Sequence, residues 1–241
     1  MDIEHVFFDL DRTLWDFETN SYEELTNLYH AHSLHQLGIS LSKEFIKVYK
    51  KINENCWEKY RLNQLSKEEL RSERFLLTLE YFGIVNQKLA EKIGDDYVSN
   101  SPYRTKLIPF TNELLNALNN RFKLHIITNG FEEVQHIKLR ESGLTHFFDH
   151  IITSEMAGAK KPNPKIFEYA LNKTNAVIEN SVMIGDDINT DISGALNVNM
   201  KAIYYNPNQK KHNLSIWREV ENLKEIKKIL LQNDKVPYNH S

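Results

Sequence analysis

Five short apolar runs constrain the fold of this chain more than any other feature of its sequence. They are four to six residues long and rich in β-branched and aromatic residues, as buried parallel strands are. The runs are HVFF at 5–8, KLHIIT at 123–128, HIIT at 150–153, SVMIG at 181–185 and KAIYY at 201–205. We predict that each of them is a strand.

Amphipathic helical patterns follow or separate these runs from about residue 105 onward. They lie at 131–143, 164–174, 190–198 and, near the C-terminus, 217–231. Alternation of strand and helix is typical of crossover connections between parallel strands. The sequence therefore predicts an α/β fold, a doubly wound parallel sheet covered by helices on both faces.

A different pattern interrupts this alternation directly after the first strand. Residues 16–103 contain helical patterns without a strand between them, at 18–37, 42–64, 66–82 and 87–100. We therefore predict an α/β core domain formed by residues 1–15 and 104–241, and an all-helical domain, 16–103, inserted into it.

Charge and composition exclude several classes of protein. The 241 residues carry a formal net charge of −3, so no strong positive field attracts a nucleic acid polymer or an anionic membrane. One cysteine excludes an internal disulfide framework and fits a reducing compartment. No apolar stretch reaches the length of a membrane span and no leader pattern is visible, so we expect a cytoplasmic protein. The sequence leaves monomer and homodimer open.

Polar residues gather where the predicted strands end. They are Asp9 and Asp11, Thr128-Asn129-Gly130, Lys160-Lys161-Pro162, and Gly185-Asp186-Asp187 with Asp191. Ligands of open parallel sheets bind beyond the carboxyl ends of the strands, so we expect these groups to converge there.

The chemistry of these groups points to phosphoryl transfer. Asp9, Asp11 and Asp186 repel one another unless a cation or proton lies between them, and Mg²⁺ prefers such oxygen ligands. A carboxylate can attack phosphorus, and a lysine and Thr128 can stabilise the transferring group. Asp187 remains an alternative to Asp186, although the spacing to Asp191 favours Asp186. An acid after a strand is also common as a turn or N-cap residue, so Asp11 or Asp191 taken singly can have that role.

The ordered motifs DLDRTL, ITNG, KKP and GDDINTD resemble motifs I to IV of the haloacid dehalogenase superfamily over almost the whole chain. The resemblance implies a Mg²⁺-dependent hydrolase whose helical insert is a C1 cap that closes over the substrate. It assigns the following roles: Asp9 is the nucleophile and Asp11 the general acid/base; Thr128 binds phosphate; Lys161 stabilises charge; Asp9, Asp186 and the backbone carbonyl of Asp11 hold Mg²⁺; Asp191 supports the metal shell or the lysine. Asn129 is a candidate phosphate ligand through its side-chain amide, or a turn residue, because Thr-Asn-Gly favours left-handed geometry.

Three longer stretches are similar to the pyrimidine nucleoside 5′-monophosphate phosphatases of the superfamily: ITNGFEEVQHIKLRESGL, KPNPKIFEYAL and CWEKYRLNQLSKEELRSERF. They imply a phosphatase that acts on a small phosphorylated metabolite, a nucleoside 5′-monophosphate first, through an aspartyl-phosphate. Trp57, Tyr60 and Arg74 of the insert are candidates for substrate contact or simply packed residues. One departure is Arg12, where many members have glycine. A 2-haloacid dehalogenase, a sugar-phosphate phosphatase and a phosphomutase remain alternatives, and a non-enzymatic binding module fits less well.

Overall fold

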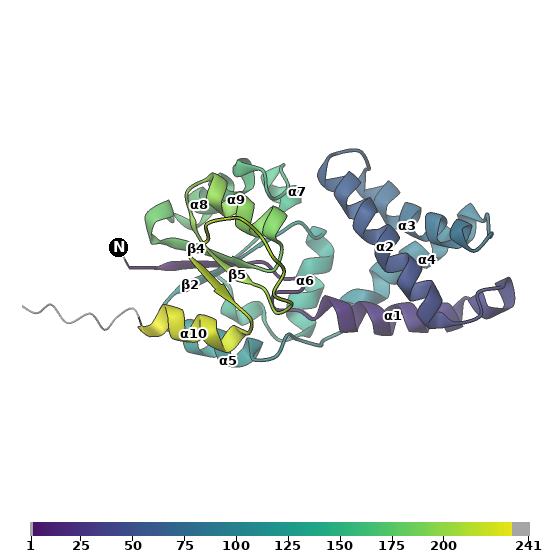
Figure 1. Cartoon of the computed structure of the whole chain (residues 1–241), viewed down its shortest axis with the longest axis horizontal. Helices are drawn as coiled ribbons and strands as arrows, with labels where there is room; N and C mark the ends of the chain where they lie inside the picture. Colours follow the sequence, from purple (N-terminus) through teal and green to yellow (C-terminus); the bar gives the residue numbers. More distant parts are fainter. Residues whose placement is uncertain (1, 233–241) are drawn as a thin grey trace, which may run out of the picture. The chain divides into compact units, whose positions relative to one another are not determined.

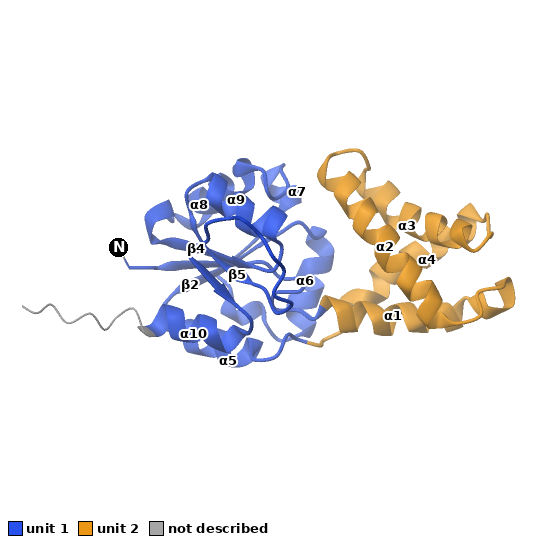
Figure 2. Ribbon diagram, viewed as in Figure 1, with its two compact units in different colours: residues 1–16, 107–241 blue, residues 17–106 orange. Residues whose placement is uncertain are grey.

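The computed structural model describes residues 2–232, and these fall into two compact units. Unit 1 comprises the chain up to Asp16 and from Leu107 onward, and unit 2 comprises Phe17–Lys106 (Figure 2). The last residues of the predicted core domain, 233–241, lie outside the described part. Unit 2 is thus one continuous segment inserted after the first strand of unit 1.

Unit 1 is built on a six-stranded sheet in which every pairing is parallel. Its strands are β1 (His5–Phe8), β2 (Lys123–Thr128), β3 (His150–Thr153), β4 (Ser181–Gly185), β5 (Lys201–Tyr205) and β6 (Arg218–Val220), in the spatial order β3-β2-β1-β4-β5-β6. The predicted doubly wound parallel sheet is confirmed, and the first five strands have the predicted bounds. The order reverses at β1, so the carboxyl ends of β1, β2 and β4 form the switch point where such folds bind ligands.

Helices cover both faces of this sheet, which explains why its strands are apolar on both sides. Successive strand side chains point to opposite faces. Phe7, Ile127 and Met183 lie on the face covered by α7 (Ser154–Ala157), α8 (Pro164–Thr174) and α9 (Ser193–Asn197). In Figure 1, α5 (Thr111–Leu118) and α10 (Leu223–Gln232) lie together on the opposite side, and α6 (Glu132–Glu141) follows β2. Both sheet faces are therefore largely apolar, and the polar side chains of the predicted site lie at the carboxyl ends of the strands.

The predicted helix over 217–231 is wrong at its start. Residues Arg218–Val220 instead form β6, which pairs with Ile203–Tyr205 of β5 and buries Val220. The helix α10 begins only at Leu223, because the Glu225 carboxylate accepts hydrogen bonds from the amide of Asn222 and caps the helix there. In a strand of three residues, the alternation of buried and exposed side chains is too short to be distinguished from a helical pattern in the sequence.

Every regular element of unit 2 is helical, and all residues of this unit are described. The α-helices are α1 (Phe17–Ala31), α2 (Ser42–Arg61), α3 (Lys67–Tyr81) and α4 (Gln87–Asn100). They enclose a separate core that includes Leu25, Phe45 and Phe75. The predicted helix 18–37 is wrong in its last six residues, 32–37. It breaks after Ala31 because Ser33 adopts a left-handed conformation with φ of 50°, and a 3₁₀ turn, Leu34–Leu37, follows.

Arg74 is buried within unit 2. Its guanidinium group donates a hydrogen bond to Asn53 Oδ1 at 3.0 Å. The central guanidinium carbon, Cζ, lies 5.0 Å from the ring centre of Tyr97. Trp57 and Tyr60 lie edge to face, with their ring centres 5.5 Å apart. These contacts give Arg74 a packing role within the helices. Within residues 2–232, no helix is both long and apolar enough to cross a membrane.

Candidate active site

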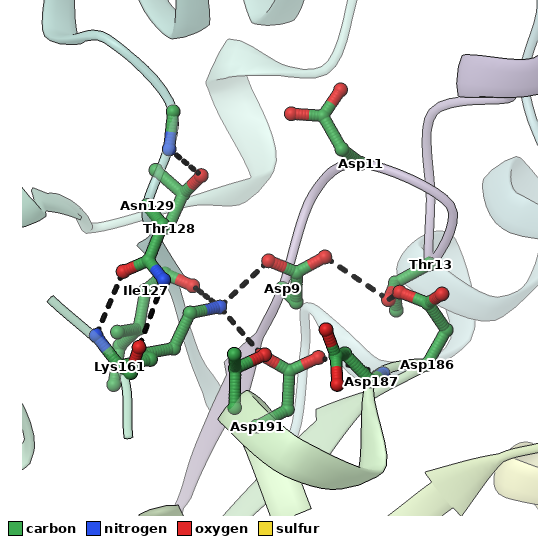
Figure 3. Close-up of polar contacts among 12 residues, drawn as sticks. Asp9, Asp11, Thr13, Ile127, Thr128, Asn129, Lys161, Asp186, Asp187 and Asp191 are labelled. Carbon is green, nitrogen blue, oxygen red and sulfur yellow. Dashed lines mark hydrogen bonds and ion pairs between the residues drawn. The ribbon is translucent and has the colours of Figure 1, made fainter. Parts of the chain in front are cut away.

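Asp9 occupies the centre of the switch point, one residue beyond β1. Its amide donates to the carbonyl of Ile184 on β4 at 2.9 Å, which fixes the main chain between two strands. One carboxylate oxygen accepts from Lys161 Nζ at 2.7 Å, and the other accepts from Thr13 Oγ1 at 3.2 Å (Figure 3). The side chain is thus held in one orientation, as a nucleophile must be.

Lys161 places its ammonium group at the bottom of the site. Besides Asp9, Nζ donates to the carbonyl of Ile127 at 2.7 Å and lies 2.7 Å from Asp191 Oδ1. Burial alone would lower the pKa of Lys161, but the Asp191 and Asp9 carboxylates raise the pKa above its ordinary value. The residue is therefore a permanent cation, with all three donors directed at oxygen atoms.

Asn129 holds the main chain of this lysine. Its side-chain NH₂ donates to the Lys161 carbonyl at 3.0 Å, and its Oδ1 accepts from the Lys161 amide at 2.8 Å. Asn129 was predicted as a phosphate ligand; in the structure its amide is engaged by Lys161 on both sides (Figure 3). This geometry supports a role in placing the lysine.

Asp186 and Asp191 enter the site from the turn after β4. Thr13 Oγ1 lies 3.3 Å from Asp186 Oδ1, so one hydroxyl connects this acid with Asp9. The second oxygen of Asp191 accepts from the Asp187 amide at 3.1 Å. Gly185 makes this packing possible, because a Cβ there would lie 2.2 Å from an oxygen of Asp191. The glycine at the strand end is therefore a steric requirement of the site.

Three carboxylates share this small space with one lysine. Oxygen atoms of Asp9, Asp186 and Asp191 lie within 4.8 Å of one another. Burial raises the pKa of Asp9 to about 7 despite Lys161 beside it, and burial with the neighbouring Asp9 also raises the pKa of Asp186. The excess negative charge fits a cation, and oxygen ligands alone fit Mg²⁺.

The bonding of each acid indicates how they would divide the work around a cation. Lys161 and the Asp187 amide occupy both oxygens of Asp191, which suits a supporting position. The carboxylate of Asp187 accepts from the Asn189 amide at 2.8 Å and caps its own turn. Asp186 has only the Thr13 hydroxyl among these contacts. The geometry therefore favours Asp186 over Asp187 as the ligand.

Asp11 lies apart from the three clustered acids, and Figure 3 shows its carboxylate turned away from Asp9. Two side chains of α6 bind it. Gln135 Nε2 donates to one oxygen at 2.9 Å and Lys138 Nζ to the other at 2.5 Å. Asp11 is thus a fixed carboxylate at the edge of the site, separate from the proposed cation.

Thr128 ends β2 with its hydroxyl beside this edge. The oxygen accepts from the Gly130 amide at 3.0 Å and from Gln135 Nε2 at 2.7 Å. Because both acceptor positions of the hydroxyl are used, its proton is left to donate to another oxygen. This arrangement suits Thr128 as a residue that binds phosphate.

Arg12 has a φ of 69°, in the left-handed region where glycine is free of the Cβ penalty. This explains why glycine suits the position in related proteins, and an arginine there costs about 1–2 kcal/mol. The charge of Arg12 opposes the rise in the pKa of Asp186. The residue therefore adds positive charge to the acidic side of the site.

Sequence reasoning missed Thr13, Gln135 and Lys138. Thr13 lies in the quoted first motif, two residues after Asp11, and only the return of the loop shows that its hydroxyl joins two acids. Gln135 and Lys138 are three residues apart, a spacing that places both on one helix face. That spacing was a usable signal, but their burial was not visible in the sequence.

Comparison with known proteins identifies the family to which this chain is similar. A family model for haloacid dehalogenase-like hydrolases matches residues 3–199. The pyrimidine 5′-nucleotidase YjjG of Escherichia coli is 29% identical over 232 residues, covering 95% of this chain and 98% of that protein. A glyceraldehyde 3-phosphate phosphatase of Methanothermobacter thermautotrophicus is 33% identical over 210 residues, with 83% and 84% covered.

A solved structure gives a similar result. The putative hydrolase YfnB of Bacillus subtilis, described as bound to magnesium, superposes with a TM-score of 0.86 at 27% identity and covers 96% of this chain and 100% of that one. The motif resemblance seen in the sequence is thereby confirmed at the level of the family and of its fold.

Proposed function

Because this chain belongs to the haloacid dehalogenase-like hydrolases, we propose that it is a phosphatase that hydrolyses small phosphomonoesters through an aspartyl-phosphate on Asp9. The observation that carries this proposal is the pair of carboxylates at the end of β1. Asp9 is buried against Lys161, whereas Asp11 is held apart from it by α6. Two fixed carboxylates in different environments suit two different roles.

In the first half-reaction, an Asp9 oxygen attacks phosphorus and forms the acyl phosphate while the ester P–O bond breaks. The leaving oxygen takes a proton from Asp11 and departs as an alcohol. In the second half-reaction, a water molecule attacks the same phosphorus, and its proton passes to Asp11. The bond between the Asp9 oxygen and phosphorus breaks, which releases phosphate and restores the Asp9 carboxylate and the protonated Asp11 with which the cycle began.

Neighbouring groups stabilise the transferring phosphoryl group. Lys161 places positive charge beside the attacked position, and the Thr128 hydroxyl donates to a phosphoryl oxygen. The carboxylates of Asp9 and Asp186, with the main-chain carbonyl of Asp11 that the family resemblance implies, would hold Mg²⁺. When bound, the ion supplies charge neutralisation between carboxylates and phosphate.

For the substrate we propose nucleoside 5′-monophosphates, chosen by the helical unit 2 acting as a cap. The support is similarity to a pyrimidine 5′-nucleotidase along 95% of the chain. The phosphate contacts are common to all monoesters, so discrimination must come from other groups. A small sugar phosphate is the second candidate, favoured by the 33% identity with the glyceraldehyde 3-phosphate phosphatase.

The test is phosphate release from matched panels of substrates, with Mg²⁺ and with EDTA. We expect kcat/KM to be higher for uridine or thymidine 5′-monophosphate than for glyceraldehyde 3-phosphate and hexose phosphates. The Asp9→Asn variant, purified in the same way, measures contaminating phosphatase. Faster turnover of sugar phosphates would overturn the nucleotidase assignment alone. Halide release from 2-chloropropionate in EDTA, without phosphate release from any ester, would overturn the phosphatase proposal.

A further inference from the structure

We propose that Gln135 and Lys138 of α6 are positioning residues for the general acid/base Asp11, and that Gln135 couples it to the phosphate-binding hydroxyl of Thr128. This inference rests on the proposed phosphatase function. It gives a role in catalysis to two side chains that do not contact the phosphoryl group and that lie outside the four sequence motifs.

Both oxygens of Asp11 are occupied from the same helix. Lys138 Nζ lies 2.5 Å from one oxygen and Gln135 Nε2 lies 2.9 Å from the other. Gln135 is fully buried and Lys138 is 5% exposed. Hydrogen bonds to a carboxylate from two directions fix its rotation as well as its position.

Lys138 is itself held in place. Its ammonium lies 4.3 Å from the ring centre of the buried Trp15, a cation–π contact. The indole comes from the same loop as Asp11 and is four residues further on. The loop after β1 thus wraps around the lysine that orients its own carboxylate.

Gln135 connects two parts of the site. The same Nε2 donates to Asp11 and, at 2.7 Å, to Thr128 Oγ1. When Asp11 is ionised it only accepts hydrogen bonds, so the NH₂ group is the side of the amide that faces it. Gln135 Oε1 is buried and has no hydrogen-bond partner among the described residues. Leaving a buried acceptor unpaired costs about 1–3 kcal/mol, which indicates that the orientation of this amide has a function.

Gly130 provides the space for this amide. A Cβ at residue 130 would lie 2.4 Å from the side-chain amide of Gln135. The glycine that follows Thr128 and Asn129 in the sequence is therefore needed for the approach of α6. The Gly130 backbone thus packs against the side-chain amide of Gln135, which in turn donates to the Asp11 carboxylate.

The orientation of Asp11 suits in-line transfer. The attacking and leaving oxygens lie on opposite sides of the phosphorus, so the acid that protonates the leaving oxygen must stand apart from the nucleophile. Asp11 is turned away from Asp9 in Figure 3 and is fixed there by α6. Releasing it should impair protonation of the leaving group while binding of the ester is kept.

The decisive measurement is the single-turnover rate of phosphoenzyme formation with two esters. Glycerol phosphate has an alkoxide leaving group that needs a proton, whereas p-nitrophenyl phosphate has a leaving group that does not. For Lys138→Met and Gln135→Met we expect a fall of roughly tenfold to a hundredfold with glycerol phosphate, with KM changed less than about threefold and a much smaller fall with p-nitrophenyl phosphate. Lys138→Arg should recover part of the rate. Lys173→Met, at an exposed position of α8, is the matched control.

A double-mutant cycle tests whether these residues act through Asp11. Adding Lys138→Met to Asp11→Asn should slow turnover no further than about twofold, because the target of the lysine is already lost. Equal losses with both esters, or losses that multiply in the double variant, would refute a positioning role. The same cycle measured by urea unfolding should also be non-additive, and this result does not depend on activity. A wild type that releases no phosphate would refute the proposed function, while strictly additive unfolding energies would refute the Lys138–Asp11 link itself.

Discussion

A buried histidine pair should make this protein sensitive to acid. His5 on β1 and His125 on β2 are 2% and 1% exposed, and His5 Nδ1 lies 3.0 Å from His125 Nε2. Nδ1 of His125 has no hydrogen-bond partner within the described part of the chain. Burial, with the nearby charges of His5 and His150, lowers the pKa of His125 from 6.5 to about 3.

This shift sets the sign and size of the effect. Between pH 6.5 and about 3 the unfolded chain binds a proton at this residue and the folded protein does not. Stability therefore falls as the pH falls through this window. A pH of 5 lies about 1.5 units below the unfolded-state pKa of 6.5. Protonation of His125 in the unfolded chain therefore lowers the free energy of unfolding by about 2 kcal/mol at that pH, at 1.36 kcal/mol per unit. That is a substantial part of the 5–15 kcal/mol of a typical domain.

Urea unfolding at pH 7.5 and pH 5, followed by circular dichroism, measures this difference. The loss between the two pH values should be about 2 kcal/mol smaller in His125→Leu than in the wild type, whatever the absolute stability of the variant. His136→Gln, at an exposed position of α6, should keep the wild-type difference. An equal pH dependence in the wild type and His125→Leu would refute the assignment of acid sensitivity to His125.

Three further predictions concern the active site. EDTA should abolish phosphate release and Mg²⁺ should restore it, since a cation relieves the repulsion among Asp9, Asp186 and Asp191; full activity in EDTA would contradict this. Asp9→Asn should abolish labelling of the protein by a ³²P-labelled ester, because the nucleophile is lost. Asp11→Asn should still become labelled, but its turnover rate, measured by quench-flow, should fall by a factor of about 10² to 10⁴. Gly185→Ala should displace Asp191 and cost about 1–3 kcal/mol with a loss of activity. Gly83→Ala has no atom within 4 Å of the new Cβ but a φ of 79° that strains an alanine, so it should lower stability and leave activity unchanged.

The sequence determined the sheet and the residues at its edge. The first five strands have the predicted bounds because a strand buried on both faces is apolar at most of its positions, which makes it a short, recognisable run in the sequence. Parallel connections then place the carboxyl ends of these strands at one edge, so the polar residues after them had to meet. Family motifs supplied the expected role of each residue, and the geometry of Asp9, Lys161 and Thr128 supports those roles.

The elements that sequence reasoning misjudged are short or depend on distant partners. The strand β6 has three residues and is a strand only because β5 offers a free edge. The break after Ala31 depends on one residue, Ser33, in a left-handed conformation that no pattern of apolar residues reveals. Local periodicity needs several turns of helix or several residues of strand before it carries information.

The tertiary structure alone decided which polar side chains act on which. Asn129 was expected at the phosphate, yet its amide holds the Lys161 main chain from 32 residues away. Lys138 reaches Asp11 across 127 residues of sequence, and Gln135 reaches it across 124. A side chain of α6 meets the β1 loop only after β1 and β2 pair and the chain packs the helix against the sheet. Hydrogen bonds depend on distances of a few tenths of an ångström and on direction, and those are set by packing rather than by the order of residues along the chain.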